Sequence, residues 1–170
     1  MPARLISIGT ASEDPIRAVD TGTNELQYVA LSYCWGKGTT LTLTSTRLAE
    51  FKKQIPWAWL PKTYQQAVNI TRSLGLSFLW IDSICIIQEG GEDWQTESAK
   101  MADVYQNAEL VVSADSGVNT DSGFLCDRSP TWHSSDRIEL PARKGGPAYL
   151  TALVDPPDGL KMRLLSPITW

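Results

Sequence analysis

The sequence has few of the residues that build metal sites and disulfide frameworks. Its 170 residues include one histidine, His133, and three cysteines, Cys34, Cys85 and Cys126. The cysteines are odd in number and widely spaced, without a CxxC pair, so we expect neither a metal site nor a disulfide scaffold. Free thiols suit a reducing compartment, and we therefore expect a cytoplasmic protein.

The sequence also lacks a long apolar run and a basic stripe. Its longest apolar stretch, residues 76–87, is interrupted by Ser77, Asp82 and Ser83, so we expect no membrane span. The first residues have no apolar segment of secretory length, and we expect no signal peptide. The net charge is −4, the pI is near 5.0, and the basic residues are scattered, which argues against DNA as a partner.

The apolar residues that are present indicate a small α/β domain. Hydrophobic residues make up 42% of the chain, enough for one core. The patterns predict strands at 28–33, 78–82 and 109–115, a short strand at 39–44, and helices at 47–55, 61–75 and 93–108. The strand at 78–82 alternates little, as in strands covered on both faces, which favours a mostly parallel sheet flanked by helices.

The pattern changes in the last third of the chain. Residues 117–170 are rich in Gly, Pro and Ser and contain only short strand-like pieces. We therefore expect one domain over residues 1–170, with its core at about 26–116 and a loop-rich extension at 117–170. Either these residues are a loop-rich appendage or the chain is a fragment of a longer protein.

One acid lies where an apolar residue is expected. In the predicted helix 93–108, one stripe at helical spacing contains Trp94, Met101, Val104, Tyr105 and Ala108. Glu97 follows Trp94 by three residues and precedes Met101 by four, so it lies inside this stripe. Carboxylates are rarely buried unless they are paired or used. Glu97 is either a structural acid, which caps a loop amide or pairs with Arg72 or Lys62, or a catalytic one.

Two further segments lie at the carboxyl ends of predicted strands, where open parallel sheets bind ligands. The first includes Ser32, Tyr33, Trp35 and Gly36, and the glycine allows a close approach of the backbone to a ligand. The second begins at Asp82. Both segments and Glu97 are expected to meet at one rim. The alternatives are ordinary turn packing for the first segment and a carboxylate that accepts loop amide hydrogen bonds for Asp82.

A thiol-based hydrolase is a further alternative. It would need His133 beside Cys85 or another nucleophile.

Four blocks of the sequence together resemble the fungal heterokaryon-incompatibility (HET) domain. They occur in the family's order between about Tyr28 and Asp115, and they are residues 28–36, 60–67, 79–88 and 92–108. Leu164–Pro167 resembles a later block of the family, in which Ile168 stands where the family has arginine. A Trp-Thr-Leu-Gln-Glu-like block that usually precedes it is missing.

The resemblance implies a role in fungal non-self recognition and programmed cell death. It also implies a remote relation to TIR domains and their flavodoxin-like sheet. Glu97 would then be the catalytic acid of an NAD+ glycohydrolase, and Trp94 would lie beside it. Ser32 to Gly36 would help form the nucleotide pocket, with NAD+ as substrate and no cofactor. The TIR likeness further implies a homo-oligomer on activation. The alternative is a non-catalytic module that signals by self-association.

Overall fold

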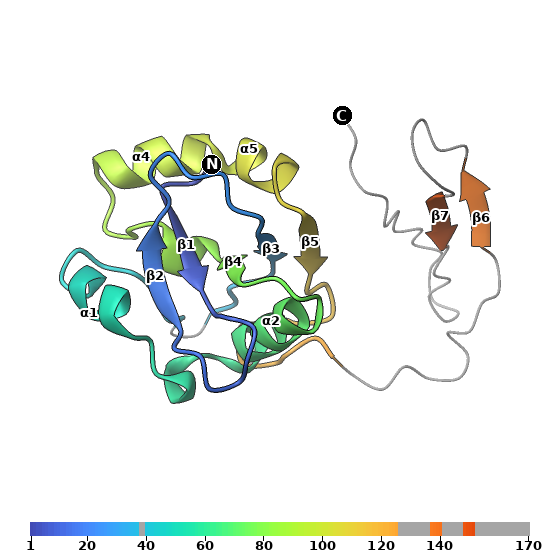
Figure 1. The fold of residues 1–170 in the computed structure, drawn as a ribbon, viewed down its shortest axis with the longest axis horizontal. Coiled ribbons are helices and arrows are strands. Elements are labelled where there is room, and N and C mark those ends of the chain that lie inside the picture. The colour runs from blue at the N-terminus through green and yellow to red at the C-terminus, as the bar shows by residue number, and fades with distance from the viewer. Residues whose placement is uncertain (38–39, 126–136, 141–147, 152–170) are drawn as a thin grey trace. The chain divides into compact units, whose positions relative to one another are not determined.

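The structure is a computed structural model that describes residues 1–37, 40–125, 137–140 and 148–151 (Figure 1). Contacts within the chain divide it into two compact units, residues 1–125 and 126–170. In the second unit, β6 (Arg137–Leu140) and β7 (Ala148–Thr151) pair as an antiparallel hairpin. His133, Cys126 and Leu164–Pro167 lie outside the described residues. In the described part of the chain, no helix is long and apolar enough to cross a bilayer.

The first unit contains a five-stranded sheet in the order β2-β1-β4-β3-β5. Its strands are β1 (Arg4–Ser7), β2 (Arg17–Asp20), β3 (Val29–Ser32), β4 (Phe78–Trp80) and β5 (Leu110–Ser113). The three strands predicted from the apolar runs near 28–33, 78–82 and 109–115 are thereby confirmed, each shorter than expected.

The prediction of a mostly parallel sheet is wrong, because the sheet is mixed. β3 pairs with β4 and with β5 in parallel, whereas β1 pairs with β2 and with β4 antiparallel. The antiparallel half includes the amino-terminal hairpin of β1 and β2, whose apolar runs are only two residues long, Leu5–Ile6 and Ala18–Val19, and carry a weak sequence signal. Such a hairpin needs only a short connection, whereas the parallel strands require helical crossovers.

The helices connect the parallel strands. α2 (Lys62–Ser73) leads from β3 to β4, and α4 (Glu92–Ala99) with α5 (Met101–Gln106) leads from β4 to β5. Since β4 and β5 flank β3 on opposite sides, right-handed crossovers bring these helices to opposite faces of the sheet (Figure 1). Shorter elements are α1 (Leu48–Lys53), the 3-10 helix η1 (Trp57–Trp59) and α3 (Asp82–Cys85).

The core is built from β1, β3 and β4 with the inner face of α2. Tyr64, Ala67, Val68 and Thr71 of α2 are buried, as their helical spacing predicted. Leu74, which continues this helical spacing, is 51% exposed and lies just beyond Ser73, the last residue of α2. The expected strand at 39–44 is reduced to an isolated bridge from Leu43 to Ile87.

The single helix predicted at 93–108 is two helices. Lys100, with φ −92° and ψ 0°, separates α4 from α5 and breaks the continuous apolar stripe. Within α4 the buried residue is Glu97, as its place in the stripe predicted. Trp94 is 44% exposed, so its expected place on the buried face was wrong.

Candidate functional site

The carboxylate of Asp82 joins the segments that follow β3 and β4. Its Oδ1 accepts hydrogen bonds from the Tyr33 hydroxyl at 2.8 Å and the Ser83 amide at 2.7 Å. Its Oδ2 accepts the indole N–H of Trp35 at 2.8 Å. The predicted meeting of Tyr33, Trp35 and Asp82 at one rim is therefore confirmed, and so is the expected hydrogen bond to a backbone amide after the strand.

A chain of hydroxyl groups continues from Asp82 into the core. The Tyr64 hydroxyl donates to the Tyr33 oxygen at 2.6 Å and lies 2.7 Å from Ser83 Oγ. Because the Tyr64 proton points to Tyr33, Ser83 is the donor in the second contact. The rings of Tyr33 and Tyr64 pack edge to face, with centroids 5.2 Å apart. We call Tyr33, Trp35, Tyr64, Asp82 and Ser83 the Asp82 cluster.

Burial governs the protonation of this cluster. Burial raises the pKa of Asp82 above its ordinary value, while the hydrogen bonds from Tyr33 and Trp35 oppose that rise. Burial likewise raises the pKa of the Tyr33 and Tyr64 phenols, so both remain protonated at neutral pH. The donors to the Asp82 carboxylate are thus all neutral groups. Their hydrogen bonds hold the segment after β3 against α3.

Glu97 is held by different partners. Its Oε2 accepts the backbone N–H of Ala3 at 2.7 Å, and its Oε1 accepts from Lys100 Nζ at 2.9 Å. The expectation that Glu97 accepts a hydrogen bond from a backbone amide outside its helix is confirmed, with Ala3 as the donor. The expected ion pair with Arg72 or Lys62 is wrong, because Lys100 is the partner. Arg72 instead donates to the Ile8 carbonyl at 2.7 Å.

Glu97 lies at the carboxyl edge of the sheet, on the β1 side. Ile6 of β1 lies opposite Leu79 in an antiparallel pair, so Arg4 and Ala3 lie beyond the end of β4. The Arg4 guanidinium donates to the Cys85 carbonyl at 2.8 Å and pairs with Asp93 at 2.5 Å. Burial alone would raise the pKa of Asp93, but Arg4 and a backbone amide hold it below its ordinary value.

The buried thiol of Cys85 lies close enough to Asp82 and Glu97 for their charges to affect its pKa. Burial chiefly raises its pKa, to about 12. A hydrogen bond to the Ile81 backbone and the charge of Arg4 oppose this rise, and the charges of Asp82 and Glu97 add to it. A thiol of this kind is a poor nucleophile. Cys85 lies on α3, whereas His133, its partner in the hydrolase alternative, falls outside the described residues.

A family model described as Heterokaryon incompatibility protein (HET) matches residues 28–156, well over half of the chain. The chain belongs to this family. No curated protein and no solved structure matches it. The match covers the Asp82 cluster and Glu97 of this HET domain. It begins after β1 and β2, so Ala3 and Arg4 lie outside it.

The remaining predicted site residues of the HET domain lie apart from these contacts. Ser32 ends β3 opposite Ser113 and is half-buried. Gly36 has φ +73°, and a Cβ there would lie 2.4 Å from Asn119 Cβ. The chain itself therefore makes the close approach that we expected of a ligand. Trp94 lies on the surface of α4, three residues before Glu97.

Sequence reasoning missed several residues of this edge. Tyr64 was predicted to be buried, but helical spacing does not reveal a partner for its hydroxyl. Lys100 was not singled out, although its spacing of three residues from Glu97 was an available signal for an ion pair. Arg4 and Ala3 could not be found, because their contacts depend on the hairpin of β1 and β2.

Proposed function

We propose that this HET domain acts in fungal heterokaryon incompatibility, where recognition of non-self ends in programmed cell death, and that it does so by cleaving NAD+. Glu97 is the catalytic acid of this proposal. The likeness of its helix to the glutamate-bearing helix of TIR domains motivates the assignment. The protein is then a TIR-like hydrolase that self-associates when it is activated.

The observation that carries the proposal is the buried carboxylate of Glu97 at the edge of the sheet where ligands bind. Glu97 is only 4% exposed. A carboxylate in such a place interacts more strongly with a developing positive charge than one in water does. Lys100, the partner of Glu97, has a side chain that is 46% exposed, so the ammonium can move into solvent and release one carboxylate oxygen.

The reaction suits a single acid. Cleavage of the bond between nicotinamide and ribose passes through an oxocarbenium-like state, which Glu97 stabilises by its charge. Nicotinamide leaves with the bonding electron pair, which neutralises its ring, and needs no proton. Water adds to the ribose carbon and loses its proton to solvent. Ser32, Tyr33, Trp35, Gly36, Asp82 and the exposed Trp94 are the proposed substrate-binding residues.

Release of nicotinamide from NAD+ by the purified protein tests this function. The wild-type chain is expected to release nicotinamide, and Glu97→Gln is expected to abolish release while its thermal unfolding stays cooperative. Glu92→Gln is the matched control, because Glu92 is an exposed acid in the same helix. Equal turnover by the Glu97→Gln variant and the wild type would exclude Glu97 as the catalytic acid.

One observation favours a second function, a non-catalytic module that signals by self-association. Both carboxylate oxygens of Glu97 have donors, the Ala3 amide and Lys100, as expected of a structural acid. In that case NAD+ stays intact even in preparations where light scattering detects assembly. Glu97→Gln then changes only stability.

A further inference from the structure

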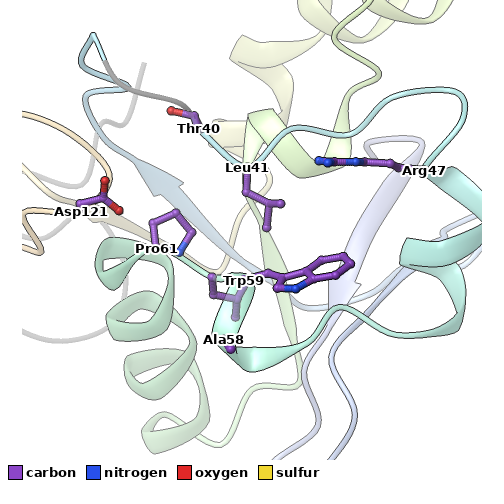
Figure 2. A pocket seen from close by; sticks show the side chains of 8 residues that line it. Thr40, Leu41, Arg47, Ala58, Trp59, Pro61 and Asp121 are labelled. Atoms are coloured by element: carbon purple, nitrogen blue, oxygen red, sulfur yellow. The ribbon is translucent and has the colours of Figure 1, made fainter.

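A pocket of about 480 Å³ opens between the segment that follows β3 and the segment that follows β5 (Figure 2). Thr40 and Leu41 belong to the first segment and Asp121 to the second, while the other walls come from residues 47–61. The volume lies within the range of about 300–1,000 Å³ that is typical of small-molecule sites. Neither Glu97 nor Asp82 lines this pocket.

Most of the pocket lining belongs to the segment that follows β3, the strand at which the order of the parallel strands reverses. β3 is the first of these strands and lies between β4 and β5, so the first crossover runs from β3 to β4 and the second runs in the opposite direction, from β4 past β3 to β5. In doubly wound sheets, ligands and nucleotides in particular bind in the crevice outside the carboxyl ends of the strands at this switch point. The topology therefore draws attention to the segments after β3 and β5, which supply the lining residues within 40–61 and Asp121, respectively.

Charges of opposite sign lie at the two ends of the pocket. Arg47 and Asp121 are far apart in Figure 2, with Leu41 and Pro61 between them. Among the described residues, the Arg47 guanidinium has no hydrogen-bond or ion-pair partner, and the Asp121 carboxylate accepts no hydrogen bond. Such a pocket suits a ligand with an anion at one end and hydrogen-bond donors at the other.

An exposed indole completes the lining. Trp59 is 44% exposed and lines the pocket, whereas Trp57, on the same short helix and 42% exposed, does not. A tryptophan face with so much free surface can stack on a planar base. The pocket thus combines a guanidinium, an aromatic face and a carboxylate.

We propose that this pocket binds a nucleoside phosphate. The phosphate pairs with Arg47, whose planar guanidinium suits phosphate oxygens. The base stacks on Trp59, and the ribose hydroxyls donate to Asp121. A free amino acid fits less well, because its ammonium and carboxylate are adjacent, while Arg47 and Asp121 lie at opposite ends of the pocket. The proposal goes beyond cleavage at Glu97 and does not depend on it.

Calorimetric titration of the whole chain with ADP, adenosine and 2′,3′-dideoxy-ADP tests each contact. Arg47→Gln is expected to weaken ADP about tenfold and to leave adenosine unchanged, since only the charged contact is lost. Trp59→Leu is expected to weaken both ligands about tenfold. Asp121→Asn is expected to weaken ADP more than 2′,3′-dideoxy-ADP, which has no ribose hydroxyls for the carboxylate.

Matched variants distinguish the loss of a pocket contact from a general effect of removing a surface arginine or tryptophan. Arg17→Gln and Trp57→Leu remove an exposed arginine and an exposed tryptophan outside the pocket and should leave ADP binding unchanged. ADP binding by a protein that releases no nicotinamide would contradict only NAD+ cleavage, and nicotinamide release without ADP binding at this pocket would contradict only this site, so the two failures are distinguishable. The proposal is overturned if millimolar ADP does not bind, or if Trp57→Leu weakens ADP as much as Trp59→Leu does.

Discussion

The two carboxylates at the carboxyl edge of the sheet, Asp82 and Glu97, are held in opposite ways. Asp82 accepts three hydrogen bonds from neutral donors, and two of these, Tyr33 and Trp35, come from the distant segment after β3. Glu97 accepts one backbone N–H, from Ala3, and one ammonium, from Lys100 in the next turn. Asp82 thus links the segment after β3 to α3, whereas Glu97 has one partner, Lys100, that can move away into solvent.

This difference separates an acid that holds the fold together, Asp82, from the proposed catalytic acid, Glu97. The Asp82 cluster lies entirely within residues that the HET family model matches, and it ties β3 to α3 and α2. Glu97 depends on Ala3, which lies outside that match, and on the half-exposed Lys100. We therefore expect changes at Asp82 to affect folding most, and loss of the ion pair between Glu97 and Lys100 to affect folding little.

The largest effect is expected for Asp82→Ala. The substitution leaves the Tyr33 hydroxyl, the Trp35 indole and a backbone amide without their acceptor, which should lower the free energy of unfolding by about 2–4 kcal/mol. Urea unfolding measures this change. Asp103→Ala, an exposed acid on α5, should cost less than about 1 kcal/mol. A loss at Asp82 as small as that of the control would show that the cluster does not link these segments.

A smaller effect is expected for Asp93→Asn, beside Glu97. Arg4, whose side chain is 8% exposed, then loses its ion pair, which should cost about 2–3 kcal/mol at neutral pH. The pKa of Asp93 is lowered in the folded state, so its stabilisation is present above the unfolded pKa of about 3.9 and is lost as the pH falls below that value. The gap between wild type and variant in urea unfolding should therefore shrink below about pH 4.

The exposed pair of Lys52 with Asp20 gives the matched comparison. Its side chains are 40% and 57% exposed, so Asp20→Asn should cost less than about 1 kcal/mol. If Asp20→Asn and Asp93→Asn cost the same, the buried position of Arg4 would not account for the effect.

The sequence predicted the parallel half of the fold and one side of the site. The runs that became β3, β4 and β5 are long enough to identify, and the carboxyl ends of parallel strands meet, so Tyr33, Trp35 and Asp82 could be brought together without coordinates. The spacing of one helical stripe also predicted the burial of Glu97. These inferences use only local periodicity and the geometry of parallel sheets.

The other side of the site could not be predicted, because it depends on non-local pairing. β1 and β2 contain only two adjacent apolar residues each, Leu5–Ile6 and Ala18–Val19, and the place of β1 beside β4 is decided by packing. Without β1, neither Ala3 nor Arg4 can be assigned to Glu97 and Asp93. The break at Lys100 likewise depends on backbone geometry.

The smallest effect is expected for the pair of Glu97 and Lys100, measured by a double-mutant cycle of Glu97→Gln and Lys100→Gln in urea unfolding. Because Lys100 is half-exposed and glutamine at position 97 still accepts the Ala3 amide, the coupling energy should be below about 1 kcal/mol. A coupling energy as large as the loss from Asp93→Asn would mean that Lys100 holds Glu97 firmly. That result would contradict the release of Glu97 that NAD+ cleavage requires, and it would favour the non-catalytic module. A small coupling together with unchanged nicotinamide release by Lys100→Gln would support Glu97 as an acid that is free to act.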